Sequence, residues 1–77
     1  MFREHDVVRL KHGVPAEDPQ RWPDVPSTAL QAGTRGTVVI VYENGPGDHA
    51  YEVEFVAADG STVGLLTLTD SDIESVG

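Results

Sequence analysis

Cysteine is absent from this chain of 77 residues, and its absence excludes several kinds of chemistry at once. Without a thiol there is no disulfide, no thiolate nucleophile and no cysteine-based zinc site. Long apolar runs are also absent, so the sequence predicts no membrane contact, and its first residues are too charged for a signal peptide. We expect one small domain over residues 1–77, located in the cytoplasm.

Lysine and arginine are absent from residues 43–77. All five basic residues lie in residues 1–42, where five carboxylates balance them, so the second half supplies the whole net charge of −8. Such a surface repels the phosphates of nucleic acid and attracts cationic partners. The eight carboxylates of the second half are Glu43, Asp48, Glu52, Glu54, Asp59, Asp70, Asp72 and Glu74.

Motifs that carry catalysis or hold a metal are missing. His5, His12 and His49 lack the close spacing of a metal site such as H-E-x-x-H. No serine-nucleophile motif, phosphate-binding loop or dinucleotide fingerprint occurs. A catalytic carboxylate would require a pocket that shifts its pKa, and a chain this short has little room for one. We therefore predict a non-enzymatic protein with no catalytic residue, metal or cofactor.

The apolar residues recur with a period of two, which predicts β-strands. The strands are expected at residues 5–10, 35–42, 50–56, 61–68 and 73–76. In the third of these, Glu52 and Glu54 alternate with apolar residues and are expected to face solvent. The second is apolar on both faces, which indicates a central strand covered on each side. In the fourth, Val63, Leu65 and Leu68 are expected to point inward, after an irregularity around residues 64–66.

The segments between these strands contain strong turn signals. Residues 44–48 break the chain, and Asp59 followed by Gly60 predicts a tight hairpin. Residues 69–72 are expected to form a one-turn helix before the last strand. Residues 11–34 form a long loop with four prolines, which disfavour regular structure, although residues 27–31 could form one helical turn.

This order of elements predicts an all-β fold, a single five-stranded SH3-like small barrel. It has a long first loop and a one-turn helix before its last strand. The absence of crossover helices excludes a parallel sheet. An OB-type barrel is the nearest alternative, but it normally requires a longer chain and a more substantial helix.

Residues 32–39 read A-G-T-R-G-T-V-V, and this glycine pattern resembles that of KOW-type and nitrile-hydratase β-type small barrels. A longer resemblance covers nearly the whole chain. Residues 5–11, 32–39, 50–62 and 66–68 resemble a family of small bacterial SH3-like proteins of unknown function. The resemblance implies the fold and implies no catalytic residue. The loop at residues 15–27 is longer than is typical of that family.

Trp22 lies inside the long loop, and it either covers an open end of the barrel or contacts a partner. The charge distribution favours a basic protein partner, because opposite charges speed association. Our first hypothesis is a protein–protein interaction module, for example an immunity or antitoxin protein that neutralises a basic nuclease-like toxin. The partner-binding residues that we predict are Trp22, Asp18, Asp24, Glu43, Asp48, Glu52 and Glu54.

Two other functions stay open. By analogy with nitrile-hydratase β-type barrels, the chain could be an accessory or maturation subunit of a metalloenzyme. By analogy with KOW-type barrels it could bind nucleic acid, but a net charge of −8 argues against direct contact. Homodimerisation through an edge strand also stays open.

Overall fold

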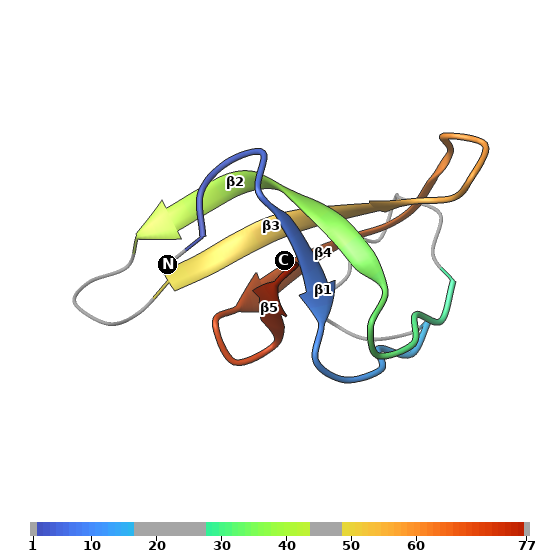
Figure 1. Cartoon of the computed structure of the whole chain (residues 1–77), viewed down its shortest axis with the longest axis horizontal. Coiled ribbons are helices and arrows are strands. Elements are labelled where there is room, and N and C mark those ends of the chain that lie inside the picture. The colour runs from blue at the N-terminus through green and yellow to red at the C-terminus, as the bar shows by residue number, and fades with distance from the viewer. Residues whose placement is uncertain (1, 17–27, 44–48, 77) are drawn as a thin grey trace.

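The computed structural model describes residues 2–16, 28–43 and 49–76, and this part of the chain is all-β (Figure 1). One antiparallel sheet contains the five strands in the order β4-β3-β2-β1-β5. The all-β prediction is confirmed, and a strand is present at each of the five predicted places. The strands are β1 (Val7–Leu10), β2 (Arg35–Glu43), β3 (His49–Val56), β4 (Thr62–Thr69) and β5 (Ile73–Ser75).

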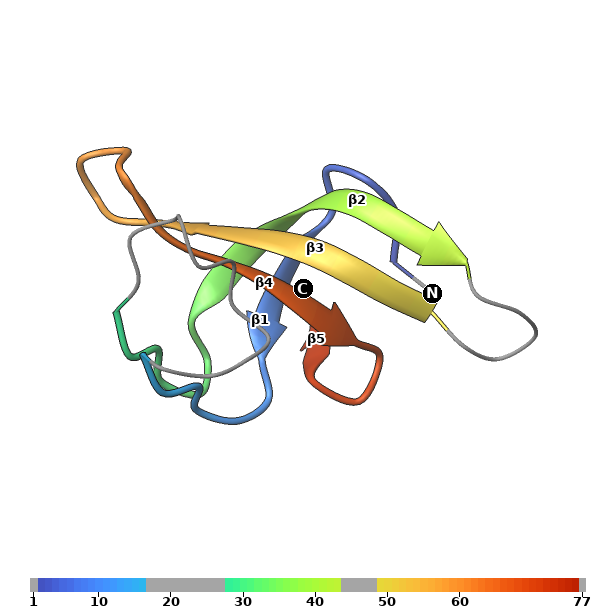
Figure 2. The same cartoon turned by 180° about the vertical axis from the view of Figure 1, so that it is seen from behind.

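The three long strands β2, β3 and β4 run side by side, whereas the short strands β1 and β5 lie at a steep angle to them (Figures 1 and 2). The sheet is therefore strongly curved, and one of its faces encloses the core. Hydrophobic side chains on that face are almost completely buried, as the alternation in β3 predicted. The core residues are Val8, Leu10, Val14, Leu30, Val38, Tyr51, Val53, Phe55, Leu66, Leu68 and Ile73.

The prediction that β2 is covered on both faces is wrong. Ile40 and Tyr42 are 40% and 38% exposed. A bulge between Val38 and Ile40 shifts the register against β3, so Val38 and Val41 both face the core while Ile40 and Tyr42 face outward. The strand is central in the sheet, but only one of its faces is enclosed.

The predicted inward positions of β4 are also wrong in part. Leu68 is buried opposite Tyr51 and Val63 is half-buried against the core, as predicted, and Leu66 is also buried, opposite Val53. Leu65 is the exception, because it lies opposite Glu54 on the other face of the sheet and is only half-buried. The irregularity lies between the pairs Phe55–Gly64 and Val56–Thr62, directly before the predicted residues 64–66. A one-residue shift in register moves every side chain of a strand to the other face.

Neither of the expected helical turns is found in the described residues. Residues 70–72 form a turn in which the Asp72 N–H donates to the Thr69 carbonyl at 2.9 Å. Within residues 28–31, Leu30 instead forms an isolated bridge with Val14, and each donates a hydrogen bond to the carbonyl of the other. No helix in the described part of the chain is long and apolar enough to cross a membrane.

Candidate functional site

The face of the sheet opposite the core is called the outer face here. The strand register places its residues in rows that run across neighbouring strands, because side chains that lie directly opposite each other point the same way. Val7, Thr37, Glu54 and Leu65 form one row across four strands, and Ile40, Glu52 and Thr67 form the next. Tyr42, on the same face of β2 as Ile40, lies opposite Ala50.

Four large hydrophobic residues of the outer face are exposed: Val7 (49%), Ile40 (40%), Tyr42 (38%) and, at the other end of β3, Val56 (54%). The two on β2 are exposed because the strands differ in length. With four residues, β1 pairs with β2 only as far as Thr37, and His5 and Asp6 extend this pairing to Val38. Beyond Val38, the described residues pair β2 with β3 only. That half of β2 lies at one end of the molecule (Figure 1).

Glu52 is not exposed, and our prediction that it faces solvent is wrong. Its residue exposure is 2%, and its carboxylate accepts a hydrogen bond from the Thr67 hydroxyl. It lies in the middle of β3, between Ile40 of β2 and Thr67 of β4, so strands flank it on both sides. A buried carboxylate is costly unless it is hydrogen-bonded, and Thr67 supplies such a bond. Glu52 is therefore not accessible to a partner in this conformation.

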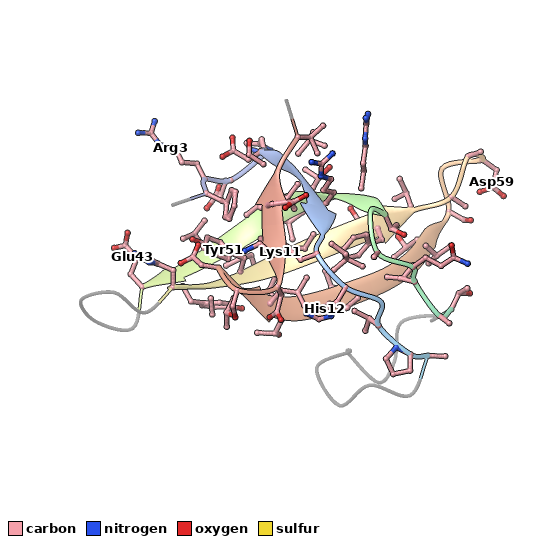
Figure 3. The ribbon with its side chains drawn as sticks, turned by 60° about the horizontal axis from the view of Figure 1, so that its bottom comes forward. Arg3, Lys11, His12, Glu43, Tyr51 and Asp59 are labelled. Atoms are coloured by element: carbon pink, nitrogen blue, oxygen red, sulfur yellow. The ribbon has the colours of Figure 1, made fainter. Side chains whose placement is uncertain are left out.

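Glu54 and Glu43 keep accessible surface. Glu54 is half-buried, and its carboxylate accepts a hydrogen bond of 2.9 Å from the Thr62 hydroxyl. Glu43 is exposed at the end of β2, directly after Tyr42 and at the end of the molecule opposite Asp59 (Figure 3). The other predicted partner-binding residues, Asp18, Trp22, Asp24 and Asp48, lie outside the described residues.

A polar cluster lies at the same end of the molecule and joins three segments. The Tyr51 hydroxyl donates to Oδ1 of Asp70 at 2.8 Å and accepts a 3.3 Å hydrogen bond from the Phe2 N–H. His49 Nδ1 lies 3.4 Å from Oδ2 of Asp70. Burial raises the pKa of Tyr51. The hydrogen bond from the Phe2 N–H lowers this pKa, whereas the contact with Asp70 raises it further. The cluster ties the N-terminal segment and the β4–β5 turn to β3.

The second carboxylate of that turn, Asp72, is held from the other side. It accepts hydrogen bonds of 2.9 Å from the Thr69 N–H and from Nε2 of His12. Burial acts to raise the pKa of Asp72, but these hydrogen bonds outweigh it, so the pKa lies below its ordinary value. His12 and His49 thus contact carboxylates of the β4–β5 turn. In residues 2–16, 28–43 and 49–76, no group of three or more histidines and carboxylates is arranged to hold a metal ion.

Sequence reasoning did not find the exposed side chains of Val7, Ile40 and Tyr42. An apolar residue looks the same in the sequence whether the strand beside it is long or short. The one available signal was Glu43, because a carboxylate directly after Tyr42 indicates that the end of this strand is in water.

A family model described as a domain of unknown function, DUF4926, matches residues 4–75. The chain belongs to this family. Because the match begins before β1 and ends with β5, the DUF4926 domain includes all five strands and the outer face. No curated protein and no solved structure matches the chain.

Proposed function

We propose that this DUF4926 protein is a non-enzymatic protein-binding module and that its outer face binds a basic protein partner. One observation carries the proposal: exposed apolar side chains of β2, Ile40 and Tyr42, lie on the same sheet face as Glu54 and next to Glu43. We also propose that the curved sheet is an SH3-like barrel, which the number and order of the strands support.

The two kinds of side chain have complementary roles in such an interface. Apolar groups, and aromatic ones such as Tyr42 in particular, supply binding energy when they are desolvated. Carboxylates around them steer a cationic partner and disfavour an anionic one. The basic residues of the outer face, Arg9 and Arg35, lie opposite each other at the far end of β2, and Arg9 is paired with Glu74. Both arginines therefore lie away from the Ile40–Tyr42 end, where Glu43 is exposed.

A basic nuclease-like toxin is one concrete form of such a partner. An acidic inhibitor associates rapidly with a basic protein and can block the cleft that binds phosphate. The net charge of −8 supports this version of the proposal. In this version, the partner has a cationic surface and an apolar recess that accepts the Tyr42 side chain.

The experiment is an affinity capture from the native host with three tagged proteins: the wild type, the double variant Ile40→Ser with Tyr42→Ser, and the control Val56→Ser. Val56 is 54% exposed but lies at the other end of β3, beside the hairpin that contains Asp59. Capture is measured at about 0.05 M salt, where the attraction between opposite charges is weakly screened, and at about 0.5 M salt, where it is strongly screened. Circular dichroism confirms that each variant is folded.

We expect the wild type and Val56→Ser to capture one basic protein at low salt. This capture should be lost at high salt, and the double variant should not capture the protein. Equal capture by all three proteins would overturn the role of the outer face. Retention of the wild type on immobilised RNA or DNA at low salt would overturn the choice of a protein partner, since a chain of net charge −8 should show none.

A further inference from the structure

Strand β4 (Thr62–Thr69) lies at one edge of the sheet and lacks the usual protection of an edge strand. Natural proteins guard such edges with charged residues, proline or short strand length. The sequence of β4 is TVGLLTLT, eight residues long, with no charged residue and no proline. Among the described strands it pairs with β3 alone, so the other side of β4 faces away from the sheet.

Hydrogen bonds at the two ends of β4 show which backbone groups point to this open side. The Val63 carbonyl accepts from the Thr28 N–H at 3.2 Å, and Thr69 exchanges hydrogen bonds with Asp72. In an antiparallel strand, the N–H and C=O of one residue point to the same side and those of the next residue point to the other. The backbone groups of Leu65 and Thr67 therefore point to the open side as well.

In the part of the chain that the structure describes, the middle of this edge is unpaired. The described residues supply no hydrogen-bond partner for the N–H or C=O groups of Leu65 and Thr67. On either side of them, Val63 is hydrogen-bonded to Thr28 and Thr69 to Asp72. The result is a short window with two donors and two acceptors in strand geometry. Such a window matches what an extended peptide presents when it adds a strand to a sheet.

We propose that Leu65 and Thr67 form a docking edge that pairs with an extended, basic segment of a protein partner. This deepens the proposed function and rests on it. The proposal concerns a different element from the Ile40–Tyr42 end of the outer face, because β4 and β2 lie on opposite sides of β3.

The charges around β4 indicate that the docked segment is basic. Residues 49–69, which span β3 and β4, contain no lysine or arginine. Glu54 shares the outer face with Leu65 one strand away, so a basic side chain on an added strand would lie about 10 Å from it, within reach of two long side chains. Asp59 and Asp70 lie just beyond the two ends of β4. A second copy of this chain would instead add a net charge of −8.

The test measures backbone hydrogen exchange by NMR, residue by residue. In the free protein, the Leu65 and Thr67 amides should exchange rapidly, while the amides of Leu66 and Leu68, which point toward β3, stay protected. The probe is a capped peptide of about eight residues with alternating valine and lysine, close to β4 in length. It should slow exchange at Leu65 and Thr67 at least about tenfold, and a valine–glutamate peptide of equal length should not.

Two variants at Leu65 test whether the peptide binds to the backbone N–H of this residue. Leu65→Pro removes an N–H that faces the open edge, where proline is tolerated, and Leu65→Val keeps it. The peptide should bind Leu65→Pro at least about tenfold more weakly than Leu65→Val. Circular dichroism checks that both are folded. If Leu65→Pro is not, the exchange measurement on the wild type decides alone.

Four outcomes would overturn the docking edge. They are protection of Leu65 and Thr67 in the dilute free protein, protection that grows with protein concentration, equal binding of the two peptides, and equal binding by the two folded variants. The second would assign the edge to a second copy of the chain. The two proposals can also be separated. If a host partner is captured through Ile40 and Tyr42 but the peptide does not change exchange in β4, the proposed function is retained and only the docking edge is rejected.

Discussion

Gly36 of β2 lies directly against core side chains of β3. A Cβ atom built on Gly36 would lie 2.7 Å from Cε1 of Phe55 and 2.8 Å from Cγ1 of Val53. Since atoms do not approach this closely, the Phe55 ring or the β2 backbone would have to move. We expect Gly36→Ala to lower the free energy of unfolding by about 1–3 kcal/mol, measured by urea denaturation.

Gly13 provides the matched control for this substitution. A Cβ atom at Gly13 would meet only the Leu30 carbonyl oxygen, at an ordinary contact distance of 3.4 Å. Gly13→Ala should therefore change stability by no more than about 0.5 kcal/mol. Equal losses for the two variants would contradict the close packing at Gly36.

His5 is the one non-glycine residue with a positive φ angle, 74°, in the described part of the chain. Its N–H donates to the Val38 carbonyl at 2.7 Å, so this conformation is tied to β2. A side chain in the left-handed region costs about 1–2 kcal/mol, which exceeds the entropy that glycine loses on folding. We expect His5→Gly to raise the free energy of unfolding by about 0.5–1 kcal/mol, measured by thermal and urea unfolding.

Glu4 lies in the same turn without a positive φ angle, and it serves as the control. Glu4→Gly should lower stability, because glycine only adds entropy to the unfolded chain there. If both glycine variants moved stability in the same direction, the strain assigned to His5 would be wrong.

At the scale of elements, the β4–β5 turn depends on the Asp72 carboxylate. The hydrogen bonds from Thr69 and His12 stabilise its charged form, so its pKa is lowered in the folded state. A lowered pKa adds stability at pH values above the unfolded pKa of about 3.9, and this contribution is lost as pH falls through the folded value. Acid should therefore loosen this turn.

Asp72→Asn removes that contribution. We expect the variant to lose about 1 kcal/mol of unfolding free energy at about pH 7 and to approach the wild type below about pH 3, because both side chains are then neutral. Urea denaturation across this pH range measures the difference. A difference that stays constant with pH would show that the Asp72 charge contributes nothing.

At the scale of the whole molecule, charge of one sign dominates. The net charge of −8 on 77 residues produces self-repulsion in the compact state, and exposed ion pairs such as Arg9–Glu74 add little stability. We expect the free energy of unfolding at neutral pH to rise by up to about 1 kcal/mol between about 0.02 M and 0.3 M sodium chloride. Potassium chloride should act equally, since screening depends on ionic strength. A fall with salt would mean that attractive pairs dominate.

Much of the fold could be predicted from alternation in the sequence. Tyr51, Val53 and Phe55 alternate with Glu52 and Glu54, and the structure buries the first three against the core. The turn signals at Asp59–Gly60 separate β3 from β4 as expected, and Gly60 has a φ of +87°. Turn chemistry and period-two patterns are local, so one sequence is enough to read them.

The candidate site could be predicted only in part, because exposure depends on neighbouring strands. Glu43 is exposed as expected, but Glu52 is buried between Ile40 and Thr67, which the alternation alone could not reveal. The exposure of Ile40 and Tyr42 arises from the difference in length between β1 and β2. The bulge in β2 follows from pairing with a distant strand, which no local pattern specifies.

The sequence by itself determined the strand class, the positions of the strands and the charge asymmetry, because period, turn residues and charge are properties of the chain. Tertiary structure alone decided which face of β4 is buried, which carboxylates are accessible and which strand edge is open. Those properties depend on register and strand order, which are set by contacts between residues far apart in the chain, such as Leu66 with Val53.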